Sequence, residues 1–235
     1  MYFDIVEAKG ENIEKVVCLE RHIGYEALFI ATRDPSLIEH IWEVNRRYKD
    51  VPLLPILITD DYAVHSDFVG RAILCVEAKN KEEFIKAIRA PYVSLIEINP
   101  SDIPKIITPR TINIAKQYYK FIDIPFKQLI YAEPIERFRI FAQMRQIARL
   151  LSQKNVRAII SSHASTVYEV ISPRQIRAIL MEMNFRDKAI KKILKENPLH
   201  LFISPLEVTI AKDDVFLDTI FRLHKIIRKT IEDKQ

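Results

Sequence analysis

The chain has 235 residues, of which 49 % are hydrophobic and 29 % are charged, a balance typical of a globular protein with a core of useful size. It has no apolar stretch near the roughly 18 residues of a membrane span, so we expect no membrane association. Only three glycines occur, Gly10, Gly24 and Gly70, and none lies within ten residues of another. Phosphate-binding loops, dinucleotide fingerprints and hydrolase nucleophile elbows need closely spaced glycines and are therefore excluded.

Short apolar runs alternate with longer helical patterns along the chain. Most runs are apolar on both faces, as in Leu28-Phe29-Ile30, which is typical of parallel strands covered by helices. We predict eight strands, at residues 2–6, 27–31, 53–59, 72–77, 93–98, 121–124, 157–161 and 199–203. We predict helices at 11–22, 34–48, 80–90, 108–119, 134–153, 172–183, 186–197 and 213–231. This order predicts an α/β fold, a single (β/α) TIM-like barrel domain over residues 1–235, with an open doubly wound sheet as the alternative.

Three predicted helices begin with a capping side chain followed by proline: Asp34-Pro35, Thr108-Pro109-Arg110 and Ser172-Pro173-Arg174. In a barrel, these helix starts lie at the carboxyl ends of the strands, where sites are usually built. Arg110 and Arg174 would then stand beside positive helix ends, which suits binding of phosphate. Capping alone explains each site equally well.

Positive charge is concentrated in the second half of the chain. The formal net charge is +5, but residues 1–120 carry 16 Lys or Arg against 18 Asp or Glu, whereas residues 121–235 carry 20 against 13. Residues 137–195 alone hold thirteen bases and three acids. Such a surface favours a polyanion, and nucleic acid is the usual one. A solvated helix face is the alternative.

A catalytic centre is not evident in the sequence. The six histidines, at positions 22, 40, 65, 163, 200 and 224, have no spacing that would bring two of them to one metal ion. Four carboxylates fall within predicted strands and are interpreted chiefly as paired structural acids: Asp4, Glu77, Glu97 and Asp123. Ser161-Ser162-His163 follows a strand, but neighbours in sequence are weak evidence for a nucleophile and its base.

Cysteine content and the N-terminus bear on the compartment. Cys18 and Cys75 lie far apart and form no metal-binding pair, so we interpret both as small core residues in a reducing compartment. The chain starts without a basic segment or signal-peptide run, and we expect a cytoplasmic protein. The 37 isoleucines and the scarcity of glycine are typical of a thermophile.

Two neighbouring segments carry a family resemblance. Val156-Arg157-Ala158-Ile159-Ile160-Ser161-Ser162-His163-Ala164-Ser165, followed by Val170-Ile171-Ser172-Pro173-Arg174-Gln175-Ile176, resembles archaeal ribonuclease P protein component 3, the family of the eukaryotic 30-kDa subunit. In that family a strand ends in Ser-Ser-Gly-Ala and a helix start of the type Arg-Ser-Pro-Arg/Tyr-Asp follows. Here His163 replaces the usual glycine, and Ile171 and Gln175 replace the usual Arg and Asp.

The resemblance implies a barrel related to polymerase-histidinol-phosphatase barrels that has lost the metal-binding histidines. It implies a protein subunit of the ribonucleoprotein that removes the 5′ leader of precursor tRNA, in which the RNA is catalytic and uses magnesium. The implied partners are the catalytic RNA, precursor tRNA, a second small ribonuclease P protein and the other ribonuclease P proteins. The chain itself would bind no cofactor and hold no catalytic or metal-ligating residue.

The basic half suits this role because Lys and Arg lower the cost of packing phosphates together. We predict seven phosphate contacts: Arg110, Arg145, Arg149, Lys154, Arg157, Arg174 and Arg177. One alternative is a metal-dependent phosphoesterase on the same barrel, using strand carboxylates such as Asp4 together with His163. Another is a protein-binding scaffold without affinity for RNA.

Overall fold

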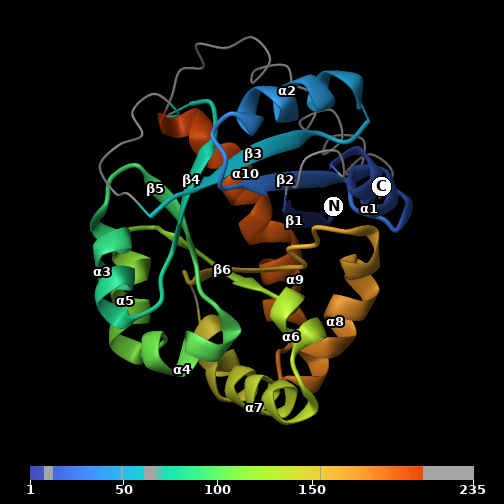
Figure 1. Cartoon of the computed structure of the whole chain (residues 1–235). Coiled ribbons are helices and arrows are strands. Elements are labelled where there is room, and N and C mark those ends of the chain that lie inside the picture. Colours follow the sequence, from blue (N-terminus) through green and yellow to red (C-terminus); the bar gives the residue numbers. More distant parts are fainter. Residues whose placement is uncertain (8–12, 49, 61–67, 69, 154, 209–235) are drawn as a thin grey trace, which may run out of the picture.

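The computed structural model describes residues 1–7, 13–48, 50–60, 68, 70–153 and 155–208. Seven parallel strands form one sheet in chain order and curve into a nearly closed TIM-like barrel, with helices around the outside (Figure 1). The strands are β1 Phe3–Glu7, β2 Ala27–Thr32, β3 Leu53–Ile58, β4 Ile73–Glu77, β5 Val93–Glu97, β6 Phe121–Pro125 and β7 Arg157–Ser161. Their buried positions on both faces reflect the predicted apolar runs.

Helices connect and cover the strands. They are α1 Ile13–His22, α2 Leu37–Arg47, α3 Lys81–Arg89, α4 Ile103–Ile106, α5 Pro109–Gln117, α6 Lys127–Tyr131, α7 Pro134–Leu151, α8 Pro173–Glu182, α9 Asp187–Lys191 and α10 Asn197–Val208. Single turns η3 Pro100–Asp102 and η4 Val167–Glu169 are 3₁₀ helices, and η5 Lys192–Glu196 is a π-helix joining α9 to α10. No described helix is long and apolar enough to cross a membrane.

The residues after β7 bring the last strand to the first. The His163 amide donates to the carbonyl of Ile5 at 2.9 Å, and the Glu7 amide donates to the carbonyl of Ala164 at 2.9 Å. The Ser162 amide donates to Asp4 Oδ1 at 2.7 Å. The segment that carries the family resemblance therefore closes the barrel beside β1.

The predicted eighth strand, at 199–203, is wrong, because these residues belong to helix α10. Leu201 and Phe202 are fully buried, and the Phe202 ring packs 5.4 Å from Phe29 and 6.0 Å from Phe3 between ring centroids. A short apolar run fits a buried strand and a buried helix equally well. Here a helix packs onto the barrel core where a strand was expected.

The helix starts at Thr108 and Ser172 are confirmed, each with a complete capping box followed by proline. The start predicted at Asp34 is wrong: α2 begins at Leu37, and Asp34 Oδ1 accepts from the Ser36 amide and hydroxyl, forming a turn. Cys75 is buried as expected, but Cys18 is exposed and is no core residue. The predicted helix at 213–231 lies outside the described residues.

Candidate functional site

A buried histidine lies at the carboxyl ends of the strands, which we call the mouth of the barrel. His163 is 2 % exposed, and its Nε2 lies 2.6 Å from Oδ2 of Asp123, the middle residue of β6. Asp123 Oδ1 accepts from the Ser161 hydroxyl at 2.7 Å. Because this serine donates to the aspartate, it has no hydrogen bond to the imidazole that could activate it as a nucleophile.

His163 acts as a cation at this place. Burial alone would lower the pKa of His163, but the charges of Glu97 and Asp123 outweigh it and raise that pKa well above its usual value. The imidazole is therefore protonated at neutral pH and neutralises the carboxylates around it. Its Nδ1 lies 3.6 Å from Glu7 Oε1. The residue has φ +51°, a left-handed conformation that glycine adopts more easily.

Lys127, on α6, supplies a second cation to the mouth. Its Nζ lies 3.1 Å from Glu7 Oε2 and 3.5 Å from Glu169 Oε2, and it donates to the Ser165 hydroxyl at 2.9 Å. Burial would raise the pKa of Glu7, but His163 and Lys127 together lower it to about 2. Asp123, Glu7 and Glu169 therefore each lie against a cation from the protein itself, whereas Glu97 Oε2 has no hydrogen-bond partner among the described residues.

The alternative of a metal-dependent phosphoesterase has no support in this geometry. Among the described residues, no group of three or more His, Cys, Asp or Glu side chains is placed to hold a metal ion. Asp4 is 2 % exposed, and its Oδ1 is occupied by the Ser162 and Ile5 amides. Two of the four strand carboxylates are paired as interpreted, Glu77 with Arg33 at 2.7 Å and Asp123 with His163 at 2.6 Å. Asp4 Oδ2 and Glu97 Oε2 have no hydrogen-bond partner among the described residues.

The six predicted phosphate contacts that the structure describes fall into four places. Arg110 and Arg174 stand exposed in the first turns of α5 and α8, while Arg145 and Arg149 share the exposed face of α7. Arg157 begins β7 and so lies at the opposite end of the barrel from the mouth. Lys154 lies outside the described residues.

Arg177 differs from the others because it lies in a pocket. The pocket has a volume of about 470 Å³ and is also lined by Tyr2, Asp187, Lys191 and Lys195. Arg177 pairs with Asp187 at 2.9 Å. Thus the seven residues do not form one patch, and their role in binding phosphate remains a prediction.

Several basic and aromatic residues near the strand starts are not among the predicted phosphate contacts. Lys191, Lys192 and Lys195 were counted in the basic run but were not chosen as contacts, and Tyr2 and Tyr119 were not considered. Their positions in the sequence could have indicated them, since Tyr2 and Tyr119 stand one and two residues before a strand. In a parallel sheet such residues gather at one end.

The protein is a parallel α/β barrel in which His163 and Lys127 lie against carboxylates at the mouth, and its second half carries an excess of basic residues. Among the described residues no catalytic centre is evident. A sequence model of the family "RNase P subunit p30" matches residues 68–205, more than half of the chain. The chain therefore belongs to the ribonuclease P subunit p30 family, as the resemblance implied.

Comparison with solved structures agrees with this fold. A chain in the "cryo-EM structure of archaeal Ribonuclease P with mature tRNA" superposes with a TM-score of 0.70 at 19 % identity, covering 90 % of this chain and 94 % of that one. A 4-hydroxy-2-oxoglutarate aldolase/2-deydro-3-deoxyphosphogluconate aldolase gives a TM-score of 0.32 at 12 % identity, covering 82 % of this chain and 94 % of that one. This score is too low to indicate a shared fold. No curated protein matches the chain significantly.

Proposed function

We propose that the chain is a protein subunit of ribonuclease P that supports RNA-catalysed removal of the 5′ leader from precursor tRNA by binding RNA and neutralising its phosphates. The family membership carries this proposal. The proposed partners are the catalytic RNA, precursor tRNA, a second small protein subunit and the other ribonuclease P proteins. The site of action would be the cytoplasm.

The distribution of charge supports a role in binding RNA. Arg110, Arg145, Arg149 and Arg174 are exposed, and no described carboxylate forms an ion pair with any of them. Unpaired cations on a surface repel one another, and phosphates relieve that repulsion while releasing counterions. Their contribution is to position and neutralise the backbone of the RNA, without reading its bases.

The isolated chain is proposed to be non-catalytic and to bind no cofactor, with the magnesium used by the partner RNA. The mouth supports this reading, because His163 and Lys127 occupy the place among the carboxylates that a catalytic cation would need.

Cleavage of precursor tRNA at limiting magnesium tests the proposal. The reaction contains the catalytic RNA with and without this chain and its small protein partner, and a parallel reaction contains the proteins alone. We expect cleavage that requires the RNA and increases when the proteins are added. Cleavage by the proteins alone, or no effect of the chain on the RNA, would contradict the proposal.

A further inference from the structure

Four cations at the strand starts are held by neutral groups. Lys116 Nζ donates to Gln153 Oε1 at 2.6 Å, and Lys192 Nζ donates to the carbonyl oxygen of the same residue at 3.3 Å. The Arg157 guanidinium lies 5.2 Å from the centroid of the Tyr119 ring, and Lys195 Nζ lies 4.0 Å from the centroid of the Tyr2 ring. No described carboxylate forms an ion pair with any of the four.

Neutral partners fix these side chains without cancelling their charge. Several cations elsewhere in the molecule are instead paired with acids, as Arg21 is with Asp50 at 2.8 Å and Lys105 is with Asp102 at 2.7 Å. Burial lowers the pKa of Lys192; the charge of Glu196 opposes this effect, and the nearby charges of Arg157 and Lys116 add to it. Like charges held this close favour a bound polyanion.

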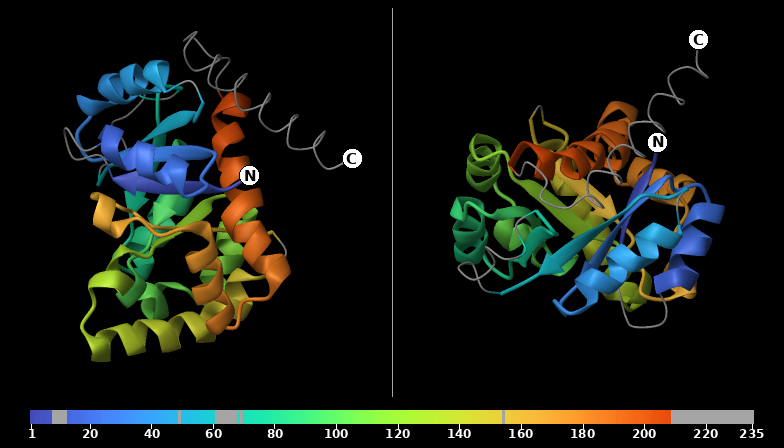
Figure 2. Two further views of the ribbon diagram at one scale, coloured as in Figure 1. Left: turned by 90° about the vertical axis from the view of Figure 1, so that its right-hand side faces the viewer. Right: turned by 90° about the horizontal axis from the view of Figure 1, so that it is seen from above.

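Helix η5 carries two of these four cations, Lys192 and Lys195. It is a π-helix, a form that is rare and frequently found at functional sites. Lys192, at its start, reaches Gln153 beside β7, and Lys195, three residues later, reaches Tyr2 beside β1. In Figure 2 the N-terminal end of the chain lies beside the long helix that follows η5.

Two tyrosines accompany the cations. Tyr119 is 68 % exposed although Arg157 lies over its ring, so most of the side chain is open to a ligand. Tyr2 lines the 470 Å³ pocket together with Arg177, Lys188 and Lys191. This volume is within the range of pockets for small ligands and is large enough for one nucleotide.

An exposed aromatic ring among cations, such as that of Tyr119, is typical of proteins that bind single-stranded nucleic acid, because unpaired bases stack on the ring while phosphates contact the cations. Tyr2 is half-buried, so its ring is available only from the pocket. A base paired in a duplex cannot stack in this way. We infer that the surface formed by Tyr2, Lys116, Tyr119, Arg157, Lys192 and Lys195, which we call the strand-start surface, binds an unpaired segment of RNA. This inference rests on the proposed function and assigns it a location and a class of RNA.

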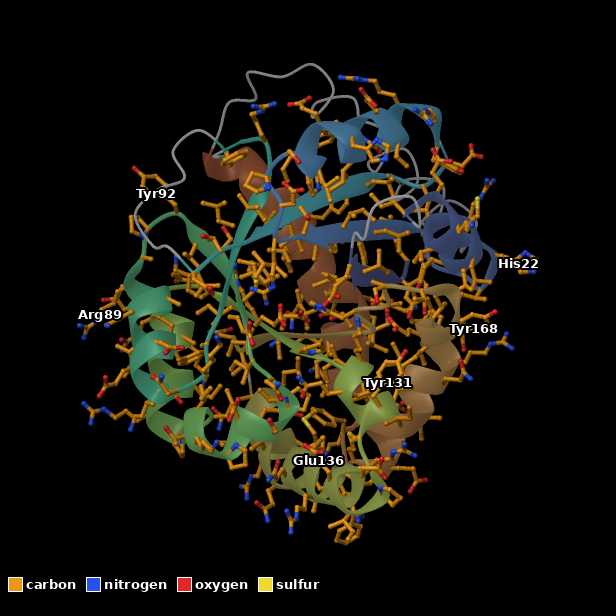
Figure 3. All side chains as sticks on the ribbon, viewed as in Figure 1. His22, Arg89, Tyr92, Tyr131, Glu136 and Tyr168 are labelled. Carbon is orange, nitrogen blue, oxygen red and sulfur yellow. The ribbon has the colours of Figure 1, made fainter. Side chains whose placement is uncertain are left out.

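The test measures binding of the full chain to a fluorescein-labelled single-stranded RNA of about 12 nucleotides and to a duplex of the same length. The main variant is Tyr119→Gly. Because Tyr119 has φ +56°, glycine removes the ring without straining the backbone, and a thermal melt checks the fold. Tyr119→Phe keeps the ring, and Tyr168→Ala removes a ring that is 93 % exposed and belongs to η4 (Figure 3).

We expect the wild type to prefer the single strand, Tyr119→Gly to weaken that binding roughly fivefold or more, and the other two variants to bind like the wild type. Lys192→Gln with Lys195→Gln should lower the dependence of log affinity on log salt by about 1.4, at about 0.7 for each phosphate that the protein no longer neutralises. The charge-matched control, Arg21→Gln with Lys105→Gln, should leave that slope unchanged.

Equal binding of single strand and duplex, or wild-type affinity in Tyr119→Gly, would overturn the inference. If the strand-start variants bind normally while the wild type still increases RNA-dependent cleavage, the surface is assigned wrongly and the proposed function stands. If the wild type neither binds RNA nor increases cleavage, the proposed function fails as well.

Discussion

At the mouth of the barrel His163 and Lys127 lie against carboxylates, whereas at the strand starts Lys192 and Arg157 lie against a carbonyl oxygen and aromatic rings. At the mouth, the cations and carboxylates of the protein neutralise one another, so little uncompensated charge is left to bind a ligand. At the strand starts, the cations keep their charge while neutral groups hold the side chains in place. In many barrel enzymes the mouth is the functional end, whereas in this protein we infer that RNA binds at the opposite end, where cations are held by neutral groups.

The largest expected effect comes from removing the cation of the mouth. His163→Gly leaves Asp123 and Glu97 buried without their counter-charge, and removing one partner of a buried ion pair costs about 3–5 kcal/mol. Relief of the left-handed backbone returns about 1 kcal/mol of this. We therefore expect urea unfolding at pH 7 to show a loss of about 3 kcal/mol. The control, His40→Gln on the surface, should show almost none, and equal stabilities would contradict a cationic His163.

Glu20 differs from the carboxylates of the mouth, because no described cation forms an ion pair with it. It is fully buried on α1, neither of its oxygens has a hydrogen-bond partner among the described residues, and burial followed by the charge of Asp4 raises its pKa to about 10. A raised pKa means that stability is full below about pH 4.5 and falls as pH rises toward 10.

Glu20→Gln should therefore unfold like the wild type at pH 4 and be more stable by about 3 kcal/mol at pH 7. Thermal melts at the two pH values check this, with exposed Glu43→Gln as the control. A variant that is less stable than the wild type at pH 7 would show that the charged form of Glu20 is stabilised in the folded protein.

Glu7, at the mouth, should give the opposite pH dependence to Glu20, with stability lost as pH falls. The pKa of Glu7 is lowered from 4.5 to about 2, so its contribution is present above about pH 4.5 and is lost as pH falls toward 2. After allowance for solvent screening we expect Glu7 to contribute about 2 kcal/mol to the loss of urea stability between pH 5.5 and pH 2.5, and Glu169, whose pKa is also lowered to about 2, to add to that loss. Glu7→Gln should reduce this pH dependence, and an unchanged profile in that variant would exclude a charged Glu7 from the network.

The smallest expected effect concerns one cation of the strand-start surface. Arg157→Gln should weaken single-stranded RNA binding only a few-fold at low salt and lower the salt slope by about 0.7, because the protein then neutralises one phosphate fewer. Fluorescence anisotropy at several salt concentrations measures both quantities. Arg33→Gln, whose guanidinium pairs with Glu77 near the mouth, is the control and should leave the slope unchanged.

Seven of the eight predicted strands and the capped starts of α5 and α8 are confirmed, because apolar runs and cap-proline pairs are local signals. The prediction from sequence failed at 199–203, where the choice between strand and helix depends on Phe3 and Phe29 from the other end of the chain. It also could not show that Lys116 and Lys192 meet at Gln153, because those contacts join separate connections of the barrel.

The family motif was visible in the sequence, but the role of its unusual histidine was not. The partners of His163 come from β1, β5 and β6, so only the folded barrel shows that it neutralises the mouth. In the same way, the thirteen bases of residues 137–195 predicted a polyanion partner without showing which of them keep their charge unpaired.

The most direct test of the account is the magnesium concentration that the catalytic RNA, with this chain and its small protein partner, needs for half-maximal cleavage of precursor tRNA. We expect Arg157→Gln/Lys192→Gln/Lys195→Gln to raise that concentration, because fewer phosphates are neutralised by protein. A mouth variant with its fold intact, Ser161→Ala, should behave like the wild type. A magnesium requirement that is unchanged by the triple variant but raised by Ser161→Ala would contradict the account and assign function to the mouth.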